Sequence, residues 1–319
     1  MSKPTIGITI GDPCGIGPEV TLKALRLLGE RRWDAADLVV YGDADVLRAT
    51  VERCLPPAPH ATVPLVDLGN FGGEICPGAC AEGGRAAMEY LEAAVDDLKS
   101  GNISALVTAP VSKEAVQITR PGFIGHTEFL GEAFGGKPVM MMVGGGLRVA
   151  LVTAHCALKD VPRLVTESAV FDTIKILDDA MRRCFGVKEP RIAVCGLNPH
   201  GSENSPWTRE DREVIAPAVV RAHKAGIRCG GPLAGDTVFH RALRGEFDAV
   251  VAMYHDQGLA PLKTVAFDGA VNVTLGLPVI RTSPGHGTAF DIAGKGVADA
   301  RSMTEAIKLA ALMAACKNK

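Results

Sequence analysis

Short, nearly unbroken apolar runs alternate along the chain with longer stretches in which apolar residues recur every three or four positions. Apolar runs of this length are typical of strands that are buried on both faces of a mainly parallel sheet. We expect such strands at Ile6–Ile10, Leu38–Tyr41, Ser104–Thr108, Val139–Val143, Arg148–Thr153, Ile192–Cys195, Ala249–Met253 and Val271–Leu275.

The intervening stretches have helical spacing. Ala86, Tyr90, Ala94 and Leu98, for example, fall on one face of an expected amphipathic helix. The alternation of strands with helices predicts an α/β fold with a mainly parallel sheet. The expected helices include Gly17–Leu28, Glu82–Lys99, Glu167–Cys184, Glu210–Ala225 and Met303–Ala315.

Polar residues gather directly after several of the expected strands. In open α/β sheets, ligands bind outside the carboxyl ends of the strands, so these polar clusters predict one shared site. The clusters are Gly11-Asp12, Ala109-Pro110, His155, Asn198-Pro199-His200 and His255-Asp256-Gln257.

Length, charge and cysteine content limit the class of protein. A chain of 319 residues suits two domains or one large α/β unit. Its net charge of −2 gives no reason to expect a nucleic acid or an anionic membrane as partner. The nine cysteines have no repeating spacing and are expected to be reduced thiols. Cys76 and Cys80 form the only close pair, and no second pair follows to complete a zinc site.

The chain start carries no targeting signal that we recognise. Met1–Pro4 runs directly into the first expected strand, without a signal-peptide pattern. No apolar stretch reaches the ~20 residues that a membrane-spanning helix needs. We therefore expect a cytoplasmic protein.

Three histidines follow three expected strands: His155, His200 and His255. Neutral imidazole is the commonest metal ligand, and three such ligands could hold one divalent ion and leave positions open for a substrate. Taken singly, each histidine is more simply explained as a satisfied residue of a polar loop. Their shared position after strands favours a metal site.

Two further groups of residues suit an anionic ligand. His126 and Thr127 lie at the start of an apolar helix, where Thr127 could be the N-cap and where a phosphate would be favoured. Lys263, Asn272 and Arg281 lie on or beside strands expected at 265–275 and 279–281. Arginine recognises carboxylate or phosphate with two parallel hydrogen bonds. A plain helix cap and surface or edge positions remain equal alternatives for these residues.

Two glycine-rich segments lie near the two ends of the sequence. Gly11–Glu19 follows the first strand and opens a helix, but it matches neither a dinucleotide fingerprint nor a phosphate-binding loop with its lysine. His286–Gly296 is expected to be a loop that opens a short helix, and its small residues would let a flat ligand approach the backbone. From composition alone, each segment is also consistent with a simple turn.

Taken together, these segments resemble the 4-hydroxythreonine-4-phosphate dehydrogenase family over nearly the whole chain. The resemblance implies a two-domain fold like that of isocitrate and isopropylmalate dehydrogenases, with the active site in the interdomain cleft. By this analogy residues 1–125 and 265–319 form the cofactor-binding domain, and residues 126–264 form the middle domain with metal ligands and dimer contacts. The matching motifs, in order, are Gly11–Glu19, Gly125–Glu128, Thr153–His155, Leu197–His200, Ala252–Gly258 and Asn272–Asp291.

The resemblance also implies roles for individual residues. It assigns His155, His200 and His255 to a divalent ion such as Zn²⁺, Mg²⁺ or Co²⁺ at the interface of a homodimer, with His255 supplied by the partner chain. It assigns substrate contacts to His126, Thr127, Lys263, Asn272 and Arg281.

NAD or NADP is implied near His286, Gly287, Asp291 and Ile292. Asp291 can accept hydrogen bonds from ribose hydroxyls and would repel a 2′-phosphate, so we expect NAD over NADP.

The implied reaction is oxidation of 4-phosphohydroxy-L-threonine at C3, followed by loss of CO₂ to give 3-amino-2-oxopropyl phosphate for pyridoxal phosphate synthesis. The metal would lower the pKa of the substrate hydroxyl, and either Lys263 or Asp256 would take its proton. The family usually has Asp where this chain has Gly285. That difference leaves open 4-phospho-D-threonate or 4-phospho-D-erythronate as substrate, and less readily a terephthalate dihydrodiol.

Two other classes of function use the same residues. A metal-dependent hydrolase or lyase could use the three histidines without a nicotinamide, although the 286–295 segment argues against it. A binding protein or sensor built on an enzyme fold would have a metal site that added ions do not fill.

Overall fold

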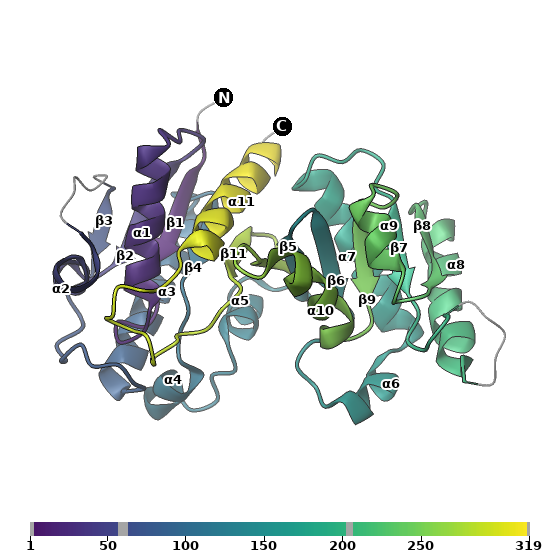
Figure 1. The fold of residues 1–319 in the computed structure, drawn as a ribbon, viewed down its shortest axis with the longest axis horizontal. Coiled ribbons are helices and arrows are strands. Elements are labelled where there is room, and N and C mark those ends of the chain that lie inside the picture. The colour runs from purple at the N-terminus through teal and green to yellow at the C-terminus, as the bar shows by residue number, and fades with distance from the viewer. Residues whose placement is uncertain (1–2, 57–62, 202–206, 318–319) are drawn as a thin grey trace. The chain divides into compact units, whose positions relative to one another are not determined.

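The computed structural model describes residues 3–56, 63–201 and 207–317 (Figure 1). The chain folds into two compact units. Unit 1 comprises Met1–Gly136 and Leu277–Lys319, and unit 2 comprises Lys137–Gly276. This division differs from the expected domain boundaries in two elements, because the helix that begins at His126 belongs to unit 1 and the strand at Val271–Leu275 belongs to unit 2.

Unit 1 is built on a parallel sheet with strand order β3-β2-β1-β4-β11. Helix α3 packs on β1, β2 and β4, while α11 lies beside α1 and packs on β1, β4 and β11 (Figure 1). The elements of this unit are β1 (Thr5–Thr9), α1 (Gly17–Glu30), β2 (Asp37–Gly42), α2 (Ala44–Cys54), β3 (Leu65–Asp67), α3 (Ala81–Ser100), β4 (Ala105–Thr108), α4 (Lys113–Thr119), α5 (His126–Phe134), β11 (Arg281–Pro284) and α11 (Arg301–Lys317).

Unit 2 has a mixed sheet with strand order β10-β5-β6-β9-β7-β8. The strands β6, β9, β7 and β8 are parallel, whereas β5 is antiparallel to both β10 and β6. The elements are β5 (Val139–Gly144), β6 (Leu147–Leu151), η1 (Leu158–Asp160), α6 (Val161–Leu164), α7 (Glu167–Arg183), β7 (Ile192–Cys195), η2 (Asp211–Ile215, π-helical), α8 (Ala216–Lys224), β8 (Cys229–Leu233), α9 (Val238–Leu243), β9 (Ala249–Ala252), α10 (His255–Ala266) and β10 (Val271–Leu275).

The apolar runs of the sequence form the buried centres of both sheets. Every residue of β4, β7 and β9 is buried, as expected of strands covered on both faces. The predicted α/β fold with a mainly parallel sheet is therefore confirmed. In the described part of the chain, no helix has the length and apolar character needed to cross a membrane.

Several local expectations were wrong. The strand expected from residue 265 begins at Val271, because α10 continues to Ala266 and carries Lys263 in its last turn. The strand expected at 279–281 is β11, which runs from Arg281 to Pro284. No helix opens within 286–296; this segment forms turns, and the next helix is α11.

Candidate active site

Three adjacent parallel strands of unit 2 end at one edge of its sheet. Strand β9 pairs with β6 on one side and with β7 on the other, both in parallel. His155 follows β6, His200 follows β7, and His255 begins α10 directly beyond β9. The carboxyl ends of parallel strands meet at one edge, so the fold directs three imidazoles to the same side of unit 2.

Gln257 and Gly258 fix the position of α10 at this edge. The Gln257 side chain accepts a hydrogen bond from the Met253 amide (2.7 Å) and donates one to the Gly196 carbonyl (2.7 Å), which joins the ends of β9 and β7. A Cβ at Gly258 would lie 2.8 Å from Val149 and 2.9 Å from Leu151, so α10 packs directly on β6. These contacts set the first turn of α10, and with it the place of His255.

The His155 and His255 rings are neighbours, with centroids 6.0 Å apart and planes inclined by 41°. Thr153 holds the two backbones together, because its hydroxyl donates to the Met253 carbonyl at 2.8 Å. His255 Nδ1 lies 2.7 Å from Asp256 Oδ1. A carboxylate that accepts from one ring nitrogen orients the imidazole and leaves the other nitrogen as a ligand.

His200 lies at the end of a loop that is organised by the buried Asp211. This carboxylate accepts hydrogen bonds from the backbone amides of Leu197 (2.6 Å) and Asn198 (3.2 Å) and from the Asn198 side chain (2.7 Å). The loop turns sharply, since His200 has φ of 64° and Gly201 has φ of 49°. His200 shares a wide, open pocket with Asp256 and Gln257 of α10.

The donor chemistry at this edge suits a divalent ion. Two imidazole rings lie together, and one of them carries the carboxylate partner that metal-bound histidines usually have. Over the residues that the structure describes, however, no group of three His, Cys, Asp or Glu side chains is placed to hold an ion.

Lys263 and Asn272 belong to unit 2 but lie on different elements. Lys263 is half-buried in the last turn of α10. Asn272 lies on β10, and its Oδ1 is buried without a hydrogen-bond partner. An unpaired buried amide oxygen has a free-energy cost, which a bound donor would remove.

Unit 1 contains a buried arginine that suits an anion. Arg281 is 4% exposed and donates from Nε (3.1 Å) and Nη2 (2.6 Å) to the Thr108 hydroxyl. Burial lowers the pKa of Arg281 to about 10, although Glu128 opposes this effect. A buried guanidinium next to a neutral hydroxyl is stabilised when an anion binds.

His126 adds a second donor beside this arginine. Burial and the charges of Arg281 and Lys113 hold the pKa of His126 well below its usual value, so the ring is neutral. Its Nε2 is buried and has no hydrogen-bond partner. Thr127 is not the N-cap that we expected, since α5 begins at His126 and Gly125 precedes it without a side-chain cap. The first turn of α5 still presents free amides to an anion.

The two glycine-rich segments contact each other within unit 1. The Ile16 amide donates to the Thr288 carbonyl at 2.9 Å, and a Cβ at Gly15 would lie 3.1 Å from Thr288. Glu19 has a structural role, because its Oε1 accepts from Lys23 (2.7 Å) and from the Ala298 amide (2.8 Å). Lys23 also donates to the Gly296 carbonyl at 2.8 Å, which fixes the end of the 286–296 segment to α1.

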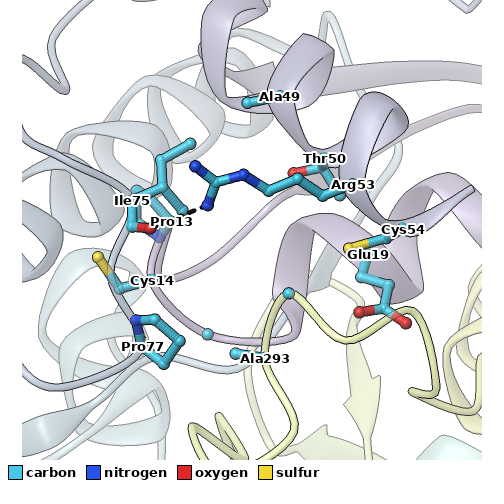
Figure 2. Close-up of a pocket in the computed structure, with 12 residues that line it drawn as sticks. Pro13, Cys14, Glu19, Ala49, Thr50, Arg53, Cys54, Ile75, Pro77 and Ala293 are labelled. Carbon is cyan, nitrogen blue, oxygen red and sulfur yellow. Dashed lines mark hydrogen bonds between the residues drawn. The ribbon is translucent and has the colours of Figure 1, made fainter.

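The 286–296 segment offers groups that suit a nucleotide. His286 Nδ1 lies 3.1 Å from the Gly287 carbonyl, and its Nε2 is buried without a partner. A Cβ at Gly287 would meet nothing within 4 Å, so the backbone is open to a ligand. Asp291 is exposed and Ile292 is half-buried. Figure 2 shows a pocket that is lined by Ala293 of this segment and by Pro13 and Cys14 of the first one.

The structure thus brings some of the predicted residues together and reveals others. His155 lies beside His255, and His126 lies near Arg281, each within one unit. The sequence interpretation missed Thr108, Lys113 and Asp211. A threonine that ends a fully buried strand could have indicated Thr108, whereas nothing in the sequence indicated that Asp211 would fold back onto the His200 loop.

Comparisons with known proteins found similar sequences and structures. The model of the family described as pyridoxal phosphate biosynthetic protein PdxA matches residues 34–310. A 4-hydroxythreonine-4-phosphate dehydrogenase from Desulfosudis oleivorans is 43% identical, with 99% of this chain and 98% of that protein covered. A protein from Oceanobacillus iheyensis, provisionally named D-threonate 4-phosphate dehydrogenase, is 40% identical over 99% of both chains. The crystal structure of a 4-hydroxythreonine-4-phosphate dehydrogenase from Klebsiella pneumoniae has a TM-score of 0.89 and 36% identity, with 98% of each chain covered.

Proposed function

Since the chain belongs to the family described as pyridoxal phosphate biosynthetic protein PdxA, we propose that it oxidises 4-phosphohydroxy-L-threonine at C3 with NAD. The 3-oxo acid that forms has a carboxylate β to its new carbonyl, so it loses CO₂ to give 3-amino-2-oxopropyl phosphate. NADP is the weaker cofactor in this proposal, because Asp291 is exposed and anionic in the segment assigned to the ribose.

The observation that carries the proposal is the set of anion donors in unit 1. Arg281 is buried beside a neutral hydroxyl, and His126 Nε2 is buried without a partner. We assign His126, Thr127 and Arg281 to the substrate's anionic groups, with Lys113 as an additional exposed cation. A substrate with an anionic group would add a charge-assisted hydrogen bond to this buried guanidinium, and such bonds are about twice as strong as neutral ones.

We assign the divalent ion to His155, His200 and His255. When bound, the ion would act as a Lewis acid toward the substrate hydroxyl. Asp256 accepts from His255 Nδ1 and keeps Nε2 as the ligand atom. In line with the family resemblance, we assign the site to the interface of a homodimer, with His255 supplied by the partner chain.

We assign the proton transfer from the substrate hydroxyl to Lys263. Of the two candidate bases, Asp256 is 86% exposed and already hydrogen-bonded to His255. Lys263 is half-buried on the same helix. A general base must reach its proton directly or through one water, so a base engaged with a metal ligand is the poorer choice. Lys263 and Asn272 are also assigned to substrate contacts, Asn272 through its unpaired Oδ1.

A second candidate substrate is 4-phospho-D-threonate. The relative from Oceanobacillus iheyensis carries that activity in its provisional name and is nearly as similar to this chain as the others. It also contains a phosphate, so the anion donors do not separate the two substrates. A terephthalate dihydrodiol has carboxylates but no phosphate, so it would use Arg281 without the phosphate that we assign to this group of donors.

A substrate panel tests the proposal. Initial rates of NADH formation are measured with a divalent ion and 4-phosphohydroxy-L-threonine, 4-phospho-D-threonate, 4-phospho-D-erythronate or a terephthalate dihydrodiol. The proposal expects turnover of the first compound at a kcat/KM at least about tenfold above the others. Preference for a phosphorylated sugar acid would support the second candidate substrate, and turnover of the dihydrodiol alone would contradict a phosphorylated substrate.

A further inference from the structure

Two cysteines far apart in the sequence lie side by side in unit 1. The sulfur atoms of Cys14 and Cys80 are 3.8 Å apart. Both cysteines are present as free thiols. A disulfide needs an S–S distance of about 2.05 Å, so a small displacement of one side chain would allow the bond.

Each sulfur is held in place by neighbouring backbone. Cys80 is the N-cap residue of α3, and its sulfur accepts a hydrogen bond from the Gly83 amide at 3.3 Å. Cys14 is fixed through its amide, which donates to Asp12 Oδ1 at 2.9 Å. A Cβ at Gly83 would lie 2.9 Å from that carboxylate oxygen and 3.2 Å from the Cys80 sulfur. The absence of a side chain at Gly83 therefore permits the two cysteines to approach.

A small oxidant can reach Cys80 more readily than Cys14. Cys14 is 2% exposed and lines the pocket of Figure 2, which has a volume of about 30 Å³ and is also lined by Pro77. Cys80 is half-buried and lines a second, open hollow that Pro77 also lines. Burial and the nearby Cys80 raise the pKa of the Cys14 thiol to about 12, so Cys14 is protonated at neutral pH. Oxidation therefore begins at Cys80, the more accessible sulfur.

We propose that Cys14 and Cys80 form a peroxide-sensitive dithiol that closes to a reversible disulfide. Hydrogen peroxide oxidises the Cys80 thiol to a sulfenic acid and is reduced to water. The Cys14 sulfur then attacks the Cys80 sulfur, an S–S bond forms, and the hydroxyl leaves with the Cys14 proton as a second water. The two thiols together lose two electrons, which peroxide accepts, and a dithiol reductant reverses the reaction.

The disulfide would act on the segment that we assign to NAD. Cys14 lies two residues before Ile16, whose amide binds the Thr288 carbonyl at 2.9 Å. Movement of Cys14 toward Cys80 displaces this contact, and with it the 286–296 segment. This consequence rests on the proposed function, and it predicts that NAD binds roughly tenfold more weakly to the oxidised protein.

Peptide mapping under non-reducing conditions tests the site without substrate or cofactor. The full chain is treated with a small excess of hydrogen peroxide, digested and analysed by mass spectrometry. We expect a Cys14–Cys80 cross-linked peptide pair that disappears after dithiothreitol. The pair should form in the wild type and in Cys76→Ser, but not in Cys14→Ala or Cys80→Ser, where serine preserves the N-cap acceptor.

Two results would contradict the proposed Cys14–Cys80 disulfide. One is a Cys76–Cys80 cross-link in its place, and the other is oxidation of Cys80 to a sulfenic or sulfinic acid without any cross-link. NAD binding by calorimetry is then compared between reduced and oxidised protein. Equal affinity for NAD in the reduced and oxidised forms would refute the effect on NAD. Weaker NAD binding in the oxidised wild type, together with unchanged binding in peroxide-treated Cys14→Ala, would support it. Absence of NAD binding in the reduced protein would count against the dehydrogenase proposal and leave the mapped disulfide unaffected.

Discussion

Buried polar atoms without partners occur at residues of two kinds. His126 Nε2 and Asn272 Oδ1 belong to residues assigned to ligands, so a bound substrate can satisfy them. Asp12 differs, since it is fully buried in the first glycine-rich turn and its Oδ2 has no partner. Burial raises its pKa to about 6, against hydrogen bonds from the backbone at Cys14 and Ser112. That carboxylate gives a residue-scale test.

Asp12→Asn should change how stability depends on pH. The pKa of Asp12 is raised from 3.8 to about 6 on folding, so the folded chain binds the proton more tightly than the unfolded chain. This group therefore lowers the free energy of unfolding as pH rises from about 4 to about 6, by about 3 kcal/mol in total. The substituted asparagine keeps the acceptor for the Cys14 amide and does not titrate. The free energy of unfolding of both proteins is measured by urea unfolding across that pH range. The value for the variant minus that for the wild type should grow with pH, and a difference that stays constant would contradict the raised pKa of Asp12.

Asp291→Lys should move the cofactor preference toward NADP. A lysine in place of this exposed carboxylate would attract the 2′-phosphate that the aspartate repels. We expect the ratio of kcat/KM for NAD to that for NADP to fall at least about tenfold. Glu52→Lys makes the same charge change on α2 and serves as the matched control. An unchanged ratio in Asp291→Lys would remove Asp291 from the cofactor site.

At the scale of elements, α10 positions much of the candidate metal site. Its first residue is His255, Gln257 joins it to the ends of β9 and β7, and Gly258 allows it to pack closely on β6. In the His-Asp-Gln-Gly sequence, the histidine and aspartate thus serve the candidate site, whereas the glutamine and glycine fix the helix against the sheet. Pro261 lies within the helix and cannot donate a backbone hydrogen bond there.

Gly258→Ala should destabilise the chain. The added Cβ would lie 2.8 Å from Val149, 2.9 Å from Leu151 and 3.1 Å from Ala252. Overpacking of this kind costs about 1–3 kcal/mol, whereas the gain in helix propensity is about 1 kcal/mol. We expect a lower urea midpoint for Gly258→Ala and a slightly higher one for Gly29→Ala, an exposed helical glycine of α1. A rise in both variants would show that α10 is not tightly packed.

The central strands could be predicted from sequence, because a short apolar run buried on both faces is a strong signal. The strand at Ile192–Cys195 has the bounds that we expected, and the strand at Val271–Leu275 matches the shorter of the two ranges expected there. The short strand β3 and the helix α10 were missed, since the first has only three residues and the second contains glycine, proline and a polar start. Among site residues, His155 and His255 proved to be neighbours, but the contact of Arg281 with Thr108 spans 173 positions and leaves no local pattern.

At the scale of the whole molecule, the proposed metal site raises the question of which chain supplies each histidine. Our proposal is a homodimer in which two subunits share the three ligands. Two inactive chains that lack different ligands can then restore one intact site, provided that these ligands come from opposite subunits.

Mixed dimers test this arrangement. His155→Ala, His200→Ala and His255→Ala are combined in pairs by co-expression with two tags. With His255 from the partner, both pairs that include His255→Ala should regain roughly a quarter of wild-type activity, since half of the dimers are mixed and each has one intact site. The pair of His155→Ala with His200→Ala should stay inactive. If activity returned only in the two pairs that share His155→Ala, or only in the two that share His200→Ala, that histidine would be the one supplied by the partner. No recovery in any pair would place all three ligands in one chain.

Oxidative decarboxylation of 4-phosphohydroxy-L-threonine is tested most directly by measuring NADH and CO₂ together. Purified protein is loaded with a divalent ion and given this substrate and NAD, and both products are followed to completion. We predict equal amounts of NADH and CO₂ for each substrate molecule consumed, and no NADH after chelation of the metal. Absence of NADH formation at saturating substrate, or NADH without CO₂, would contradict the proposed reaction.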